Sequence, residues 1–204
     1  MNLKKAYLIV FIVLVIDQIT KIYVKTHFVY GEAGQVHVTD WFKIFFVENE
    51  GMAWGAEIPG AYGKIALTLF RIAAVGGIGY WLWLSVKEKA SNLLIFAISL
   101  ILAGAFGNIL DSVFYGRIFN ESYMQPAVLF SDEPYAPWFY GKVVDMFYFP
   151  IIKDFPMPEW VPFLGGKNFT FFNAIFNIAD VAISTGVGLL IVFNKKAFAK
   201  KETI

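Results

Sequence analysis

The feature that most constrains this chain is a set of four apolar segments, each long enough to cross a lipid bilayer. They cover residues 6–24, 65–86, 93–114 and 173–193. The hydrocarbon core of a bilayer is about 30 Å thick, and roughly 20 mainly apolar residues span it as an α-helix. We therefore predict an all-α membrane protein with four transmembrane helices, folded as a single domain over residues 1–204.

The composition agrees with a membrane protein. Hydrophobic residues make up 58% of the chain and charged residues 16%, whereas soluble proteins average about 45–50% and about 25%. The formal net charge of +1 argues against nucleic-acid binding through a basic surface. The sequence contains no cysteine, which excludes a disulfide scaffold, a thiol nucleophile and a cysteine-ligated metal.

Basic residues indicate how the segments are oriented. They gather before the first segment, between the second and third, and after the fourth: Lys4, Lys5, Lys87, Lys89, Lys195, Lys196, Lys200 and Lys201. Lysine and arginine near short loops favour the cytoplasmic side. Both termini are therefore expected in the cytoplasm, and the long connections 25–64 and 115–172 are expected outside.

The first segment also has the length of a cleaved signal peptide. No cleavage site of small residues follows it, however, and polar residues from Asp17 to Lys21 extend it. We interpret it as a retained helix.

The two outer connections differ in character. Apolar and polar residues alternate along residues 35–47, and this pattern predicts a short hairpin or small sheet. Residues 115–172 hold seven of the eight prolines and many aromatic residues. Proline disfavours a long helix, and amphipathic aromatic rings collect at the headgroup level of a bilayer. We expect this connection to lie at the outer membrane interface.

Ionisable side chains within the segments are candidates for function, since each costs a few kcal/mol to insert. Asp17 and Lys21 lie four residues apart on one helix face, which a local ion pair would explain. Arg71 either extends to the interface or pairs with a carboxylate of another helix. In the third segment Asn108 and Asp111 follow Gly104 at helical spacing, with Gly107 alongside. Close helix packing explains the glycines but not the polar pair.

The fourth segment carries the clearest polar stripe. Asn173, Asn177, Asp180 and Ser184 share one helix face, which predicts a stripe pointing into the bundle. Polar packing alone would explain the asparagines and the serine. A buried Asp180 needs a partner or a function, because an unpaired buried charge is costly.

Acid–base chemistry by carboxylates is the reaction these residue types best support. The two histidines, His27 and His37, lie in the first outer connection without a clear nucleophile, and zinc-binding spacing and a phosphate loop are absent. Two aspartates that share one proton can activate water and polarise a carbonyl. Taken alone, Asp145 in the second outer connection is an ordinary loop carboxylate.

Five short blocks give the chain a specific resemblance. They are Asp17-Gln18-Ile19-Thr20-Lys21, Asn49-Glu50-Gly51-Met52-Ala53-Trp54, Gly107-Asn108-Ile109-Leu110-Asp111, Val143-Val144-Asp145-Met146-Phe147 and Phe176-Asn177-Ile178-Ala179-Asp180. In this order and on four spans, the chain resembles the bacterial lipoprotein signal peptidases, also called type II signal peptidases.

The resemblance implies an intramembrane aspartyl endopeptidase of the bacterial inner membrane, monomeric, without metal or cofactor, whose site faces outward. Its substrate would be a diacylglyceryl-modified prolipoprotein, cut before the lipidated cysteine, and globomycin-type inhibitors would occupy the same site. The implied catalytic residues are Asp145 and Asp180. The implied supporting residues are Asp17, Lys21, Asn49, Gly51, Asn108, Asp111 and Asn177. Among them, Asn108 and Asn177 are expected to orient the carboxylates, and Asp111, Asn49 and Lys21 to brace the outer loops.

Two departures from the family pattern stand out. Many members have arginine where this chain has Ser112, so Arg117 or Arg71 is expected to supply the charge. About twenty extra residues also separate Asp111 from Asp145, and segment 115–140 is a candidate lid over bound precursor.

Two other functional classes compete with the peptidase. A small proton-coupled transporter would use Asp17, Asp111 and Asp180 as a relay, but neither broken-helix pairs nor internal symmetry are present. A non-catalytic membrane assembly subunit would explain the small residues but not the aspartates. Cleavage of a lipidated precursor without added metal or ion gradient separates these alternatives.

Overall fold

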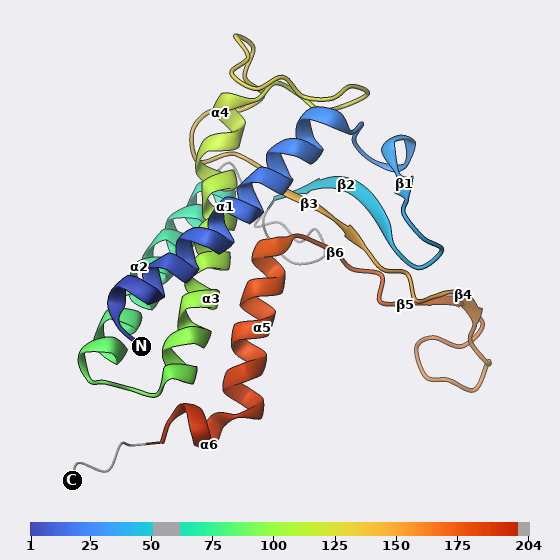
Figure 1. The fold of residues 1–204 in the computed structure, drawn as a ribbon. Coiled ribbons are helices and arrows are strands. Elements are labelled where there is room, and N and C mark those ends of the chain that lie inside the picture. Colours follow the sequence, from blue (N-terminus) through green and yellow to red (C-terminus); the bar gives the residue numbers. More distant parts are fainter. Residues whose placement is uncertain (51–61, 200–204) are drawn as a thin grey trace.

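A computed structural model describes residues 1–50 and 62–199 (Figure 1). Three helices are long and apolar enough to cross a membrane. The first two are α1 (Leu3–His27) and α2 (Gly63–Lys87). The third begins as α3 (Asn92–Leu110) and continues through a π-helical turn (Asp111–Tyr115) into α4 (Gly116–Ile118). These helices contain the first three predicted apolar segments, each extended by a few residues.

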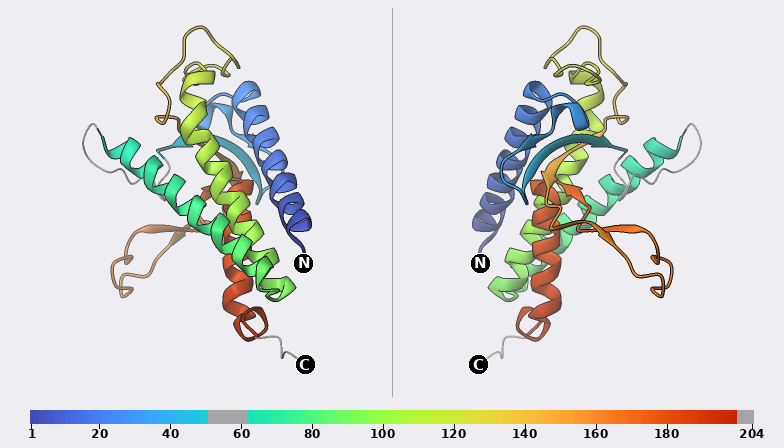
Figure 2. Two further views of the ribbon diagram at one scale, coloured as in Figure 1. Left: turned by 90° about the vertical axis from the view of Figure 1, so that its left-hand side faces the viewer. Right: turned by 90° about the vertical axis from the view of Figure 1, so that its right-hand side faces the viewer.

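Helix α3 forms the centre of the bundle. Helices α1, α2 and α5 (Ile178–Val192) all pack against it, and α1 and α2 lie on opposite sides of its outer half (Figure 2). The core between α1, α2 and α3 is aliphatic, with Leu82, Ile95 and Ile98 fully buried. The outward faces of the helices expose residues such as Phe11, an arrangement suited to lipid.

Small residues set how closely α3 and α5 approach, as the sequence predicted. A Cβ atom on Gly104 would lie 2.2 Å from the carbonyl oxygen of Ala179, and one on Gly186 would lie 2.7 Å from that of Ala97. Neither distance is sterically possible, so larger residues would force the helices apart. The close contact holds the first turn of α5 against the outer part of α3.

The predicted fourth span, 173–193, is wrong at its outer end. Helix α5 begins at Ile178 because Asn177 and Asp180 form a capping box, which fixes the helix start. Asn173 lies outside the helix, where its side-chain oxygen accepts a hydrogen bond from the Tyr148 hydroxyl at 2.8 Å. The predicted stripe is further broken at Ser184, which is exposed. A short helix, α6 (Asn194–Ala197), follows α5.

A four-stranded antiparallel sheet lies at the outer ends of the helices (Figure 1). Its strand order is β1 (Val36–His37), β2 (Lys43–Asn49), β3 (Val143–Tyr148) and β6 (Ile175–Phe176). The β1–β2 pair confirms the predicted hairpin. Pairing of Val47 with Asp145 brings the end of β2 beside the middle of β3. A buried cluster that includes Phe46, Val144 and Met146 packs the sheet against the helix ends.

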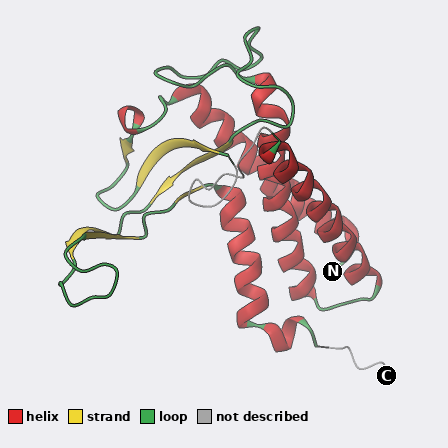
Figure 3. Cartoon of the chain, turned by 180° about the vertical axis from the view of Figure 1, so that it is seen from behind, coloured by secondary structure: helices red, strands yellow, loops and turns green. Residues whose placement is uncertain are grey.

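The long outer connection divides into two parts. Residues 119–142 form an irregular insertion, attached to α1 by Lys25, whose ammonium group is fully buried and bonds to Glu48 of β2 and, at 2.7 Å, to Ser122. Residues 151–172 form a hairpin of β4 (Ile152–Pro156) and β5 (Asn168–Phe171), which projects away from the helices (Figure 3). A short 3₁₀ helix (Glu32–Gly34) precedes β1.

Candidate active site

The two predicted aspartates meet at the outer end of the bundle. Asp145 lies on β3 and is 4% exposed. Asp180 lies in the first turn of α5 and is half-buried. The two aspartates are 35 residues apart in the sequence. The capping box fixes where α5 begins, and the β3–β6 pairing holds that start beside β3, so together they set the position of one carboxyl group relative to the other.

A single residue, Asn177, contacts both carboxyl groups. Its side-chain amide donates a hydrogen bond to Asp145 Oδ1 at 2.7 Å, and its backbone N–H donates to Asp180 Oδ2 at 3.3 Å. Asn108 of α3 completes the bridge, since its Nδ2 donates to Asp180 Oδ1 at 2.9 Å and its Oδ1 accepts from Asn177 at 3.2 Å. The expectation that these two asparagines orient the aspartates agrees with this geometry.

Asn49 has a more direct role than the bracing expected from the sequence. Its side-chain amide donates to Asp145 Oδ2, so both oxygens of this carboxyl group accept a hydrogen bond from an amide. The contact depends on the β2–β3 pairing, which no local sequence pattern reveals. The predicted supporting residue Gly51 lies outside the described residues.

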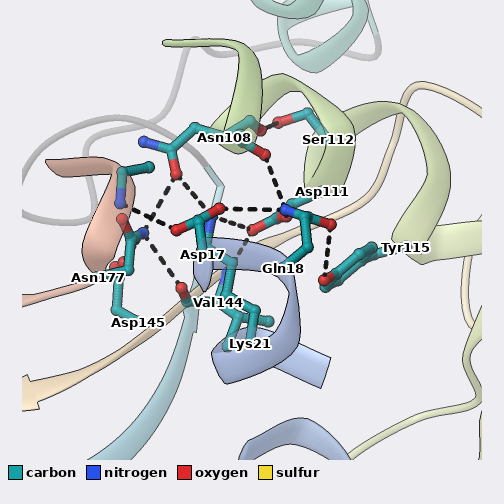
Figure 4. A network of polar contacts seen from close by, with 12 residues as sticks. Asp17, Gln18, Lys21, Asn108, Asp111, Ser112, Tyr115, Val144, Asp145 and Asn177 are labelled. Carbon is teal, nitrogen blue, oxygen red and sulfur yellow. Dashed lines mark hydrogen bonds and ion pairs between the residues drawn. The ribbon is translucent and has the colours of Figure 1, made fainter. Parts of the chain in front are cut away.

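Beneath the aspartates, Lys21 forms a fully buried ionic cluster (Figure 4). Its Nζ lies 3.0 Å from Asp17 Oδ2 and 2.8 Å from Asp111 Oδ2, and it donates to Asn108 Oδ1 at 2.9 Å. An ammonium group has three donors, and all three are used. Because lysine only donates, it fixes the amide of Asn108 with its oxygen towards Lys21 and its nitrogen towards Asp180.

The two carboxylates of the cluster tie the site together. Asp17 Oδ1 accepts the backbone N–H of Ala179 at 2.9 Å, at the positively polarised start of α5. Asp111 Oδ2 accepts the backbone N–H of Val144 at 3.2 Å, which attaches β3 to the end of α3. The ion pair expected between Asp17 and Lys21 is present, but its expected place at the membrane interface is wrong. The pair is buried, and Asp111 joins it as a third charged residue.

Three residues of the network were missed from the sequence. Gln18 donates to Asp17 at 3.1 Å and to Asp111 at 3.0 Å, and it accepts from the Tyr115 hydroxyl at 3.1 Å. Ser112 is fully buried and donates to the carbonyl oxygen of Asn108 at 3.1 Å. Gln18 and Ser112 each follow an aspartate of the motif blocks directly, and this adjacency was the available signal.

The position of Ser112 leaves the charge at this site to another residue. Arg117, one of the two expected substitutes, is exposed. Arg71 of α2 is half-buried, and the charge that acts on it is that of Asp180. Among the described residues Arg71 forms no ion pair within 4.0 Å, so both alternatives that the sequence left open for it stay predictions.

The pKa of Asp145 is raised to about 8, chiefly by burial and also by the neighbouring charges of Asp180 and Asp111. Lys21 and the hydrogen bond from Asn177 act in the opposite direction. Asp145 is therefore protonated at neutral pH. Among the described residues, no group of three or more His, Cys, Asp or Glu side chains is placed to hold a metal ion. Acid–base chemistry is what these residues themselves offer.

Comparisons with known proteins agree on one family. A family model described as signal peptidase II matches residues 9–195. The lipoprotein signal peptidase of Porphyromonas gingivalis is 48% identical over 186 residues, which cover 90% of this chain and 80% of that protein. The lipoprotein signal peptidase of Amoebophilus asiaticus is 40% identical over 198 residues, covering 95% and 78%.

A solved structure supports the fold. A bacterial membrane enzyme determined by the in meso method at 1.9 Å resolution superposes with a TM-score of 0.62. The two sequences are 25% identical, and the match covers 95% of this chain and 94% of the other.

Proposed function

We propose that this chain, which belongs to the signal peptidase II family, removes the signal peptide from diacylglyceryl-modified prolipoproteins by cutting before the lipidated cysteine. Asp145 and Asp180 are its catalytic residues in this proposal. The observation that carries the assignment is the double contact of Asn177, whose side chain bonds to one carboxyl group and whose backbone bonds to the other.

The surroundings of the two carboxyl groups suggest different roles. Asp145 is buried and holds a proton at neutral pH. Asp180 is more exposed than Asp145 and lies at the N-terminal turn of α5, so it is the better placed of the two to meet water. We assign Asp180 as the general base and Asp145 as the acid.

In the proposed reaction, Asp180 removes a proton from water, and the oxygen attacks the carbonyl carbon of the scissile peptide bond. Asp145 donates a hydrogen bond to the oxygen that becomes negatively charged. The proton taken up by Asp180 then passes to the leaving amine of the lipidated cysteine, and the peptide bond breaks. Asn108, Asn177 and Asn49 keep the two carboxyl groups in position throughout.

The proposed topology has four spans, with both termini in the cytoplasm and the site at the outer face of the inner membrane. Its support is the placement of the basic residues and of the polar network, which lies in the C-terminal half of α1 and at the C-terminal end of α3, whereas Lys4 lies at the start of α1 and Lys87 precedes α3. At this depth the acyl chains of the precursor remain in lipid while water reaches its peptide bond. A lid role for segment 115–140 and a monomeric state stay predictions.

Purified protein in detergent micelles tests the function directly. A lipidated precursor peptide is expected to be cut before its modified cysteine without added metal or ion gradient, and a globomycin-type inhibitor is expected to block the cut. The same peptide without the diacylglyceryl group serves as control and is expected to remain largely intact. An uncut lipidated precursor would favour the transporter or the assembly subunit instead.

The raised pKa of Asp145 predicts a loss of activity in alkaline solution. Below about pH 8 this residue holds the proton that the reaction needs, and above it the proton is lost. The rate constant kcat/KM for precursor cleavage should therefore fall about tenfold per pH unit above about pH 8. Recovery of activity on return to pH 7 controls for unfolding. A flat profile to pH 10 would contradict the assignment of Asp145 as the acid.

A further inference from the structure

The hairpin of residues 151–172, which we call the arm, exposes large apolar side chains that none of residues 1–50 and 62–199 covers. Phe163 is 94% exposed and Trp160 is 81% exposed, and both lie in the loop between β4 and β5. The strands and the residues that flank them add further exposed apolar side chains: Ile151, Ile152, Phe155, Phe171 and Phe172. A contiguous apolar surface of this kind usually marks an interaction site, and a lone two-stranded hairpin is at best marginally stable in water.

The conformation of the arm tip is defined by its backbone. Hydrogen bonds from Met157 N to Lys167 O, at 3.0 Å, and from Gly166 N to Met157 O, at 3.1 Å, close the loop. Phe163 adopts a φ of +64°, a left-handed conformation that costs a residue with a side chain about 1–2 kcal/mol. Its exposed ring gains almost no contact from the described part of the chain in return, which is consistent with a contact made to the surroundings of the protein.

The length of α5 indicates at which depth the arm lies. Its 15 residues extend about 22 Å, about 8 Å less than the hydrocarbon core of a bilayer. With the basic residues of α6, Lys195 and Lys196, at the inner surface, the first turn of α5 lies below the outer edge of the hydrocarbon. The arm leaves the sheet beside this turn and projects sideways, alongside α5 and not beyond its outer end (Figures 1 and 3).

We propose that the arm is a membrane anchor, which inserts Trp160 and Phe163 into the outer leaflet of the bilayer that the helices cross. The helix beside which it projects, α5, also exposes apolar side chains, among them Val181 and Ile191. Tryptophan prefers this interface because its ring is apolar and its N–H is polar. Two lysines and two acidic residues leave the arm without net charge, so apolar burial and not attraction to anionic lipid drives the insertion.

The absence of native cysteine allows a clean test by single-site labelling. Phe163→Cys carries the fluorophore NBD in full-length protein reconstituted into phosphatidylcholine nanodiscs. Asp132→Cys, at an exposed position of the outer insertion, is the matched control. We expect nitroxide-labelled phosphatidylcholine to quench NBD at position 163 at least threefold more than at position 132, and iodide to show the reverse order. Anionic lipid should leave both results unchanged.

Several outcomes would overturn the anchor. Equal iodide access at the two positions would mean that the arm remains in water. Protection from iodide without quenching by lipid would indicate a protein partner or a second copy of the chain, and quenching that requires anionic lipid would indicate electrostatic attachment. Retained precursor cleavage verifies that the labelled protein is folded, and Trp160→Cys replaces Phe163→Cys if it is not. The lipid readout itself does not depend on the catalytic assignment.

Discussion

Replacing Asp145 or Asp180 by asparagine is expected to lower kcat for precursor cleavage by about 10³-fold or more. Positioned proton transfer contributes about 10²–10⁴-fold in enzymes, and asparagine can neither accept the proton of water nor give one up. Each substitution keeps the size of the side chain and much of its hydrogen bonding, so the amount of folded protein should change little. The measurement is single-turnover cleavage of a lipidated precursor in micelles.

A matched control variant and the variant with both substitutions test this prediction further. Asp132→Asn makes the same chemical change at an exposed site and should leave the rate unchanged. Because the two aspartates act as one unit, the variant with both substitutions should be about as slow as either single variant and not slower by the product of their effects. Cleavage at the normal rate by either single variant would refute the pair.

The sequence predicts the three long helices and the identity of the polar residues well, because apolar length and helical spacing are local properties. It misplaces the start of α5, because the capping box at Asn177 and the pairing of β6 override the apolar pattern of residues 173–177. The pairing of β6 depends on β3, which lies about 30 residues earlier in the chain.

The interior of the site was less predictable for the same reason. Spacing alone paired Lys21 with Asp17, whereas its shorter contact is with Asp111, 90 residues away, at 2.8 Å. The contact of Asn49 with Asp145 depends on strand register. The family resemblance named these residues as supporting ones, but the protein's three-dimensional contacts decide which carboxyl group each of them touches.

Lys21→Met is expected to be the most destabilising of the supporting substitutions. It leaves Asp17 and Asp111 buried without their cation, and removal of one partner from a buried ion pair costs about 3–5 kcal/mol. Lys64→Met is the control, because the Lys64–Glu50 pair is less buried than the Lys21 cluster, with 12% and 34% of the side chains exposed, and its loss should cost less. Thermal unfolding in detergent compares the two variants, and equal melting temperatures would contradict the structural role of the cluster.

Activity at a temperature where Lys21→Met remains folded separates stability from positioning. Without the ammonium group, Asn108 Oδ1 loses the donor that fixes its orientation, and the amide can turn away from Asp180. We then expect kcat to fall at least tenfold with little change in KM, since the reacting groups and not the precursor are displaced. A folded Lys21→Met protein that cleaves at the normal rate would show that Asn177 alone holds Asn108, and the ionic cluster would then serve only to join the helices to the sheet.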